Sequence, residues 1–329
     1  MPSRALLAGI VALGGAGVTA VALASTDARK SATTGWRPLA PAGLERTEVT
    51  AARIGRHAYV VGGFEKASGR TTAVMERYDL RADRWRRLRP LPLAVNHATA
   101  VAYRGRLYVH GGYTERRARQ SAVRRLYEYT PRTGRWRRLP DSPTPRAAHA
   151  VAVLGGRLYA AGGANATGSV ASMETYDFAA RRWRKGPALG GPARDHTTGV
   201  ASGGRFYVLG GREGTANNYA VAERFDPRRR SWQRLPAMAR ERAGIASVAL
   251  PGGRIAVFGG EDFGTGRTIG EVELLDTRTR RWSRLPDMRT PRHGLGGVAR
   301  GNRVYSLLGG PRPGFHFAST AEFLDVRPR

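Results

Sequence analysis

The sequence contains no cysteine, which removes several kinds of chemistry at once. Disulfides, zinc–thiolate sites, iron–sulfur clusters, thiol nucleophiles and lipidation on cysteine are all excluded. Lysine is almost as scarce, since Lys30, Lys66 and Lys185 are the only three. Lys and Arg together number 55, against 25 acidic residues. The net charge of +30 therefore comes almost wholly from arginine. Glycine is abundant, at 43 of 329 residues without a three-residue period, which favours a turn-rich all-β chain over a collagen.

The N-terminal segment has the composition of a targeting signal. An uncharged apolar stretch, residues 5–24, follows Arg4 and ends in Ala22-Leu23-Ala24. A basic start, an apolar run and a small-x-small end predict a signal peptide over residues 1–24. The run is also long enough to cross a bilayer, so an uncleaved N-terminal anchor is the alternative. After a linker at residues 25–34, both interpretations place the rest of the chain outside the cytoplasm, secreted or on the extracytoplasmic cell surface.

A repeat of about 50 residues fills the rest of the chain. Tryptophans recur at Trp36, Trp85, Trp136, Trp183, Trp232 and Trp282, and glycine pairs recur at 62–63, 111–112, 162–163, 210–211, 259–260 and 309–310. Seven residues before the last five tryptophans stand Tyr78, Tyr129, Tyr176, Phe225 and Leu275. All six tryptophans of the protein belong to this pattern, which indicates a repeat architecture.

Each repeat unit predicts four short strands. In the second unit we expect them at residues 98–103, 106–110, 123–129 and 135–139, where β-branched and aromatic runs are separated by glycine-containing turns. The glycine pair, the Tyr/Phe-Asp step and the Trp six residues after that Asp resemble the kelch repeat of β-propellers over residues 35–329. The overall pattern is similar to that of secreted, bacterial-type kelch proteins. This resemblance implies an all-β, six-bladed kelch propeller with four-stranded antiparallel blades.

The order of the repeat landmarks predicts how the ring closes. Trp36 precedes the first glycine pair by 26 residues, whereas no Trp follows the last pair at 309–310. We therefore expect the N-terminal strand around Trp36 to complete the C-terminal blade, which removes open strand edges. A closed ring needs no partner to fold, so a monomer is expected.

Most repeated residues have structural explanations. We expect the tryptophans to fill space between blades and the glycine pairs to allow close backbone approach. One acid recurs in five blades, two residues before the Tyr/Phe/Leu position, which indicates a buried scaffold partner for an arginine: Glu76, Glu174, Glu223, Glu273 and Glu322.

The segment that enters the innermost strand carries Arg or His in every blade. In the kelch family this segment and the loops after Gly-Gly lie on one face that often binds ligands, and the resemblance implies the same face here. The candidate ligand-binding residues at the channel mouth are Arg46, His97, Arg146, His149, Arg194, His196, Arg242, Arg292 and His293. Such a ring would suit carboxylate or phosphate groups. The alternative is that these residues pair with backbone carbonyls or with the repeated glutamates as scaffolding.

Arginines also cluster around each outer-strand Trp and predict a basic belt on the rim. The belt discourages strand pairing between molecules and would also attract anionic cell-wall polymers or acidic glycans. We expect no nucleic-acid partner, because no nucleic-acid motif is present and the chain is expected to be exported.

These features favour a non-catalytic binding module whose ligand is an extracellular protein or an anionic carbohydrate. Kelch-like enzymes offer two precedents. The copper site of galactose-oxidase-like enzymes needs a Cys–Tyr thioether, which this chain cannot form. A sialic-acid mutarotase type of enzyme is the alternative, with mouth arginines holding a sugar carboxylate while Asp195, His196 or a loop Glu moves a proton. No catalytic residue is expected, because the even repeat spacing leaves no long insertion for a lid and no Ser-His-Asp or paired-carboxylate constellation departs from the repeat. No cofactor or metal is expected, since His97, His149, His196 and His293 are spread over four blades.

Overall fold

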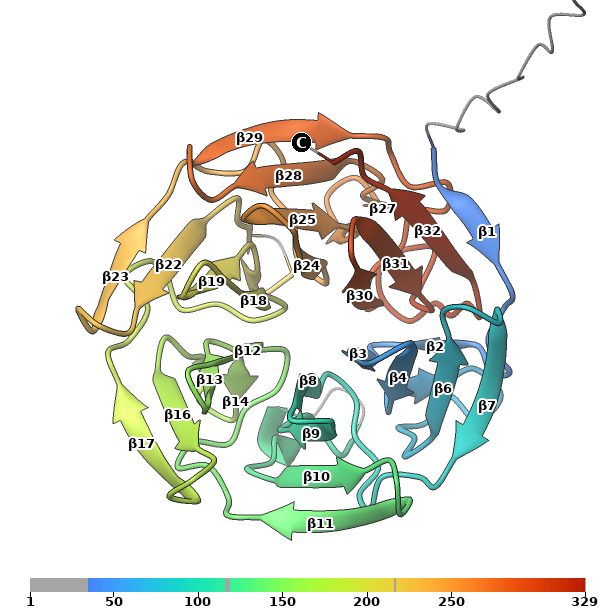
Figure 1. The fold of residues 1–329 in the computed structure, drawn as a ribbon, viewed down its shortest axis with the longest axis horizontal. Coiled ribbons are helices and arrows are strands. Elements are labelled where there is room, and N and C mark those ends of the chain that lie inside the picture. The colour runs from blue at the N-terminus through green and yellow to red at the C-terminus, as the bar shows by residue number, and fades with distance from the viewer. Residues whose placement is uncertain (1–34, 116–118, 216, 329) are drawn as a thin grey trace, which may run out of the picture. The chain divides into compact units, whose positions relative to one another are not determined.

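The computed structural model describes residues 35–115, 119–215 and 217–328, and these form a ring of six antiparallel sheets (Figure 1). The expected signal segment at residues 1–24 and the linker at 25–34 lie outside the described residues. From the innermost to the outermost strand, the six blades are β3 (Thr50–Ile54), β4 (His57–Val61), β6 (Met75–Asp79) and β7 (Arg84–Leu88); β8 (Thr99–Tyr103), β9 (Arg106–His110), β10 (Leu126–Thr130) and β11 (Arg135–Leu139); β12 (Ala150–Leu154), β13 (Arg157–Ala161), β16 (Met173–Asp177) and β17 (Arg182–Gly186); β18 (Thr198–Ser202), β19 (Arg205–Leu209), β22 (Ala222–Asp226) and β23 (Ser231–Arg234); β24 (Ala246–Leu250), β25 (Arg254–Phe258), β28 (Val272–Asp276) and β29 (Arg281–Leu285); and β30 (Gly296–Arg300), β31 (Arg303–Leu307), β32 (Ala321–Asp325) and β1 (Arg37–Leu39).

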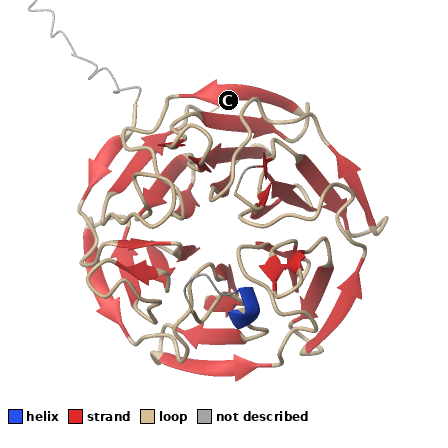
Figure 2. Ribbon diagram, turned by 180° about the vertical axis from the view of Figure 1, so that it is seen from behind, coloured by secondary structure: helices blue, strands red, loops and turns tan. Residues whose placement is uncertain are grey.

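Smaller elements lie in the loops between the second and third strands and, in the first blade, also in the segment that precedes the innermost strand. Four two-residue pairs and one 3₁₀ helix, visible in Figure 2, occur there in the described part of the chain: β2 (Arg46–Thr47) with β5 (Phe64–Glu65), β14 (Ala164–Asn165) with β15 (Gly168–Ser169), β20 (Arg212–Glu213) with β21 (Asn217–Asn218), β26 (Glu261–Asp262) with β27 (Arg267–Thr268), and η1 (Arg119–Ser121). No helix among the described residues is long and apolar enough to span a membrane.

Strand sequence follows strand position within the blade. The second strand, such as β9, is an apolar run buried beyond its first residue, because the adjacent blades cover both of its faces. The outermost strand, such as β7, exposes Arg84, Arg86 and Arg87 and half-buries only Trp85 and Leu88. This gradient places the core between blades and the charge on the circumference.

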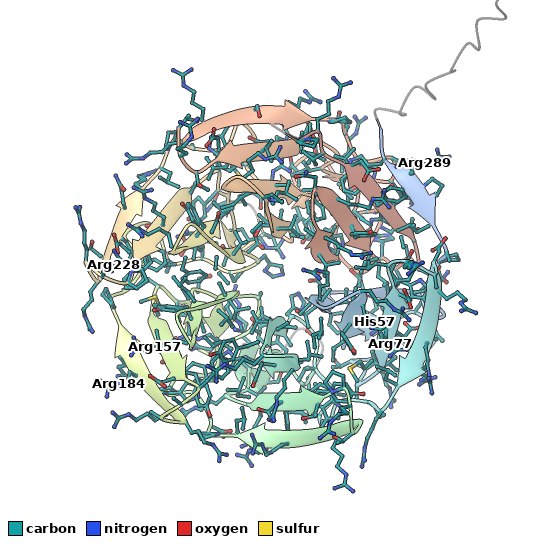
Figure 3. The ribbon with its side chains drawn as sticks, viewed as in Figure 1. His57, Arg77, Arg157, Arg184, Arg228 and Arg289 are labelled. Atoms are coloured by element: carbon teal, nitrogen blue, oxygen red, sulfur yellow. The ribbon has the colours of Figure 1, made fainter. Side chains whose placement is uncertain are left out.

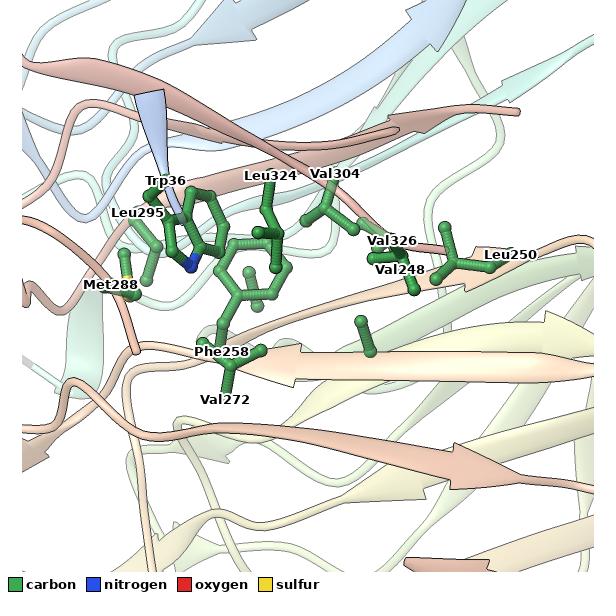
Figure 4. Close-up of a cluster of buried hydrophobic side chains, with 12 residues drawn as sticks. Trp36, Val248, Leu250, Phe258, Val272, Met288, Leu295, Val304, Leu324 and Val326 are labelled. Atoms are coloured by element: carbon green, nitrogen blue, oxygen red, sulfur yellow. The ribbon is translucent and has the colours of Figure 1, made fainter. Parts of the chain in front are cut away.

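The N-terminal strand closes the ring, as the sequence predicts. β1 pairs with β32 in the register Arg37↔Phe323, Pro38↔Glu322 and Leu39↔Ala321. Trp36 then enters the core between the fifth and sixth blades, where its ring centroid lies 5.7 Å from that of Phe258 (Figure 4). The first described residues and the last strand of the chain therefore form one blade.

Each tryptophan also links its blade to the preceding one. Its indole Nε1 donates to a backbone carbonyl just after the preceding outer strand, at 2.8 to 3.2 Å, and the six pairs run round the whole ring: Trp36–Pro286, Trp85–Ala40, Trp136–Arg89, Trp183–Pro140, Trp232–Pro187 and Trp282–Pro236. The structural role expected for the six tryptophans is confirmed.

The glycine pairs lie where neighbouring blades approach most closely. A Cβ on Gly62 would stand 2.3 Å from the carbonyl oxygen of Val95 in the next blade, and one on Gly63 would stand 2.4 Å from that of Thr47. Gly63 also has a φ of 96°, a conformation that side chains disfavour, and its amide donates to Val95. Close backbone approach therefore explains the pair, as expected.

Candidate functional site

The five arginines predicted to line the mouth are instead buried inside the blades. Arg46, Arg146, Arg194, Arg242 and Arg292 are all 0% exposed. Each guanidinium forms an ion pair of 2.6 to 3.3 Å with the repeated glutamate of its own blade: Glu76, Glu174, Glu223, Glu273 and Glu322 respectively. The scaffold interpretation is therefore the correct one for the arginines, and a ligand at the mouth cannot reach them.

The second blade shows that each arginine and its glutamate belong together. Val95 replaces the arginine there, and Tyr127 stands where the other blades have the glutamate. A buried charge without a partner is strongly unfavourable, so losing both members is tolerated where losing one is not. This blade thus supports a purely structural role for the pair.

Two residues after each of these entry positions, one residue of each blade lies at the opening of the channel. We call these residues the mouth ring; all six have φ between 49° and 69°, in the left-handed region: Glu48, His97, Ala148, His196, Gly244 and Gly294. Backbone hydrogen bonds of 2.8 to 3.1 Å join its members, from His97 N to Glu48 O, Ala148 N to His97 O, Gly244 N to His196 O and Gly294 N to Gly244 O. The six blades thereby present six equivalent positions to one opening.

The channel behind the mouth ring is a cavity of about 360 Å³. Its wall consists of the innermost strands of all six blades, which supply mostly Ala, Val, Thr and Gly. Of the ionisable side chains that line it, Glu48, His97 and His196 lie on the mouth ring and His149 directly follows it, whereas Arg53 lies on β3. Most of the chemistry available to a small ligand is therefore at the mouth ring.

Three of the mouth-ring side chains meet across the opening. His97 Nε2 lies 3.1 Å from His196 Nε2 and 3.1 Å from Glu48 Oε2. All three side chains keep a small exposed fraction, between 11% and 13%. Although the histidines are spread over four blades, two of them form a compact group with Glu48, because equivalent positions face one another across the channel.

Charged side chains from the neighbouring loops complete what we call the mouth cluster, which contains Glu48, His97, Asp195, His196, Arg212, Glu261 and His293. Arg212 donates to His196 Nε2 at 2.9 Å and to Glu261 Oε1 at 2.6 Å. His293, fully buried, places Nδ1 3.1 Å from Glu48 Oε1 and 3.3 Å from Glu261 Oε2. Acidic and basic groups are therefore mixed around the opening.

The pKa directions follow from this packing. Burial lowers the pKa of His97 to about 4, against the opposing effect of Glu48. Burial alone would raise the pKa of Glu48, but His97 and His293 hold it below its ordinary value. Burial alone would also lower the pKa of His293, but Glu48 and Glu261 raise it. His97 is thus neutral near pH 7, whereas His293 is stabilised in its charged form.

His149 does not join the mouth cluster. Its Nε2 lies 2.9 Å from His110 Nδ1 and 2.8 Å from Thr99 Oγ1, in a separate network that continues to Ser142. Burial lowers the pKa of His110 to about 3 and that of His149 well below its ordinary value. This predicted site residue is therefore a buried neutral partner of His110.

Sequence reasoning found His97, His196 and His293 but missed Glu48 and Arg212. Glu48 occupies the same repeat position as His97 and His196. An alignment of the six repeats at the segment before the innermost strand would therefore have identified Glu48 as a site residue. Arg212 follows the fourth glycine pair directly and lies in β20. Nothing in its local sequence distinguishes it from the many other arginines.

Aromatic side chains surround the mouth cluster. The ring centroids of Phe64 and Tyr113 lie 5.9 and 5.5 Å from that of His97. Arg212 lies over the ring of Phe263, 5.1 Å from its centroid. Phe263 is 39% exposed and is the one large hydrophobic side chain classed as exposed among the described residues. The entrance thus combines buried charges with an accessible aromatic surface.

The arginines expected on the rim are exposed. They lie on or beside the outermost strands, and Figure 3 labels two of them, Arg184 and Arg228, on the circumference. The exposed set is Arg84, Arg86, Arg87, Arg89, Arg135, Arg137, Arg138, Arg181, Arg182, Arg184, Arg228, Arg229, Arg230, Arg234, Arg280, Arg281 and Arg284. We call this set the basic rim.

The ring and its blade chemistry define a kelch-type β-propeller. A family model of the KLHDC2/KLHL20/DRC7 Kelch-repeats domain matches residues 48–240, and a Kelch motif model matches residues 246–289. The chain therefore belongs to the kelch-repeat family.

Individual relatives share parts of the chain. Kelch-like protein 26 of Homo sapiens is 40% identical over 85 residues, which are 26% of this chain and 14% of that protein. The F-box/kelch-repeat protein At1g16250 of Arabidopsis thaliana is 36% identical over 90 residues, which are 27% of this chain and 23% of that protein. The chain thus matches less than a quarter of the length of these relatives.

A solved structure has the same fold over nearly its whole length. The structure of YjhT superposes with a TM-score of 0.75 at 16% identity, covering 88% of this chain and 98% of that one. At this identity the likeness concerns the fold alone.

Proposed function

We propose that the protein is a non-catalytic binding module, secreted or anchored at the cell surface, that holds an extracellular protein at its channel-mouth face. A kelch propeller is in general a binding or interaction module. The observation that carries the choice of face is Phe263, which is exposed beside the mouth cluster and stacked on Arg212. Aromatic residues and arginine are enriched at the centres of protein interfaces.

The charges of the mouth favour a protein over an anionic carbohydrate at this face. The arginines that would have held a carboxylate are buried in ion pairs. The groups that lie beside the opening are instead acids together with Arg212, all largely buried. A polypeptide, which presents both charges and an apolar side chain, matches such a mixed surface better than a polyanion does.

The basic rim supports a second ligand at a different place. Its 17 exposed arginines lie on five of the six blades, and only some of them pair with a nearby acid, so the rim carries an excess of positive charge. Anionic cell-wall polymers or acidic glycans would be attracted by this charge with little geometric specificity. We propose this as an attachment surface that acts beside the mouth and not in place of it.

Two variants separate these proposals. Phe263→Ala should reduce capture of proteins from the extracellular fraction of the source cells at least about tenfold, because it removes the anchor. Arg184→Ala/Arg228→Ala should leave that capture unchanged but weaken retention on an anionic glycan, most clearly at low salt. Both variants should have the same melting temperature as the wild type. Protein capture that Phe263→Ala leaves intact would exclude the mouth as the docking face.

An enzyme of the sialic-acid mutarotase type is the alternative function. It is favoured by one contact, in which Asp195 Oδ1 lies 2.6 Å from His196 Nδ1 and orients a base at the mouth. Conversion of a small acidic sugar that His196→Ala abolishes would establish this alternative and contradict a non-catalytic module.

A further inference from the structure

Three potential ligand atoms converge at the mouth ring from three different blades. His97 Nε2, His196 Nε2 and Glu48 Oε2 all lie within 4.8 Å of one another, and two of their separations are 3.1 Å. A divalent ion placed among such atoms makes bonds of about 2.0–2.2 Å to imidazole nitrogen and carboxylate oxygen. The opening is therefore small enough for a single ion to touch all three groups.

Hydrogen bonds to the opposite ring nitrogens fix the tautomers. His97 Nδ1 lies 2.5 Å from Asn96 Oδ1, and the Asn96 amide group is oriented by its donation to Thr71 Oγ1 and the Tyr113 carbonyl. His196 Nδ1 lies 2.6 Å from Asp195 Oδ1. Because an oxygen acceptor faces each Nδ1, the proton of each neutral ring is on Nδ1. Both Nε2 atoms then carry a free lone pair. Two lone pairs and a carboxylate oxygen thus face one another.

The fold itself does not need these side chains. In the other three blades the mouth ring has Ala148, Gly244 and Gly294 at the same backbone conformation. A residue with a branched or long side chain at positive φ costs about 1 kcal/mol relative to glycine. Glu48, His97 and His196 therefore occupy unfavourable backbone positions that smaller residues fill equally well for folding.

We propose that Glu48, His97 and His196 bind one divalent transition-metal ion, with zinc as the first candidate. Two imidazoles and one carboxylate are the donor set of this class, whereas calcium and magnesium select oxygen ligands and copper(I) selects sulfur. Asn96 and Asp195 act as outer partners that hold the imidazoles in the ligating tautomer. Three protein ligands leave one position of a tetrahedral ion for water or for a ligand in the channel.

Two neighbouring groups adjust to this ion. Arg212 releases His196 Nε2 and keeps its second hydrogen bond, to Glu261 Oε1. His293 Nδ1 lies 3.1 Å from the other oxygen of Glu48 and 3.3 Å from Glu261 Oε2. The second group of possible ligands, Glu48, Glu261 and His293, shares Glu48 with the first. The inference does not depend on the nature of any macromolecule that docks at this face.

The test is a metal titration of the full chain, purified without a polyhistidine tag and treated with a chelator. Zn²⁺ added to it should bind with a stoichiometry of one per chain and raise the melting temperature by mass action. Co²⁺ in its place should give visible absorption bands characteristic of nitrogen and oxygen coordination. Absence of stoichiometric binding to the wild type would overturn the proposal.

The variants exploit the repeat. His97→Ala and His196→Ala each reproduce the residue that Ala148 already supplies at the equivalent position, so both should fold. Each should weaken Zn²⁺ binding by at least about 100-fold, more than the loss of an outer partner does. His316→Ala removes a histidine that contacts Pro313 outside the mouth cluster and should bind Zn²⁺ as the wild type does. Equal affinity in His97→Ala, His196→Ala and the wild type would place any bound ion elsewhere and contradict the proposal.

Discussion

Arg242 illustrates how a single residue holds one blade together. Its guanidinium lies 2.9 Å from Glu273 Oε1 and donates to the carbonyls of Gly259 and Glu271, with no solvent exposure. Its own backbone carbonyl accepts a hydrogen bond from Gly211 of the preceding blade. The residue therefore connects two strands of its blade and the adjacent blade at once.

Removing one member of this pair should be costly, because it leaves a buried charge alone. Arg242→Ala and Glu273→Ala should each lower the free energy of unfolding by about 3–5 kcal/mol. The double variant should lose about 1–3 kcal/mol less than the sum. Denaturant unfolding of the four proteins measures this coupling, with Arg240→Ala, on an exposed arginine, expected within about 0.5 kcal/mol of the wild type. Strictly additive losses would contradict a direct pair.

At the scale of single residues, the sequence predicts which side chains pair better than it predicts where those side chains point. The recurrence of Arg and Glu in the same five blades indicates the pair, but whether each guanidinium faces the mouth or the blade interior depends on side-chain rotamers. Glu48 and Arg212 escaped prediction for a related reason. Their importance comes from contacts with residues of other blades, which no local pattern around them encodes.

Strands followed the repeat closely. In the second blade the expected strands at 106–110 and 135–139 have the observed bounds, and the first begins one residue later than expected. The third begins at Leu126 and not at residue 123, because Val123 donates its amide to Gly112 in the loop before the strand. The two-residue strands after the glycine pairs have no pattern of their own and depend on backbone contacts within the folded loops.

The indole links between blades act at the scale of whole strands. Trp232 of β23 donates to the carbonyl of Pro187, which follows β17, at 3.0 Å. Trp232→Phe keeps the aromatic packing but removes the donor, so the free energy of unfolding should fall by about 1–3 kcal/mol. Ser231→Ala, on the exposed adjacent residue, should change it by less than about 0.5 kcal/mol. Equal stability of Trp232→Phe and the wild type would show that the indole bond does not hold these blades together.

The mouth cluster is a property of the whole ring. His97 and His196 stand 99 residues apart and touch because blades two and four face the same narrow channel. The repeat predicts the angular position of each side chain around the axis. It does not predict that the channel is narrow enough for side chains to meet across it, since that width follows from blade number and packing together.

Ring closure by the N-terminal strand underlies this entire arrangement, and removing that strand tests it most directly. A chain lacking residues 1–40 loses the pairing of β1 with β32, the burial of Trp36, and the two indole links that involve Trp36 and Ala40. A matched chain lacking residues 1–34 keeps all of these contacts.

Thermal unfolding of the full chain and the two truncated chains is the decisive measurement. The shorter truncation should melt with the full chain, whereas the chain lacking residues 1–40 should melt about 10 °C or more below it, because it loses a buried tryptophan and a full strand pairing. Identical melting temperatures for all three would contradict a ring closed by β1 and, with it, the mouth that the ring assembles.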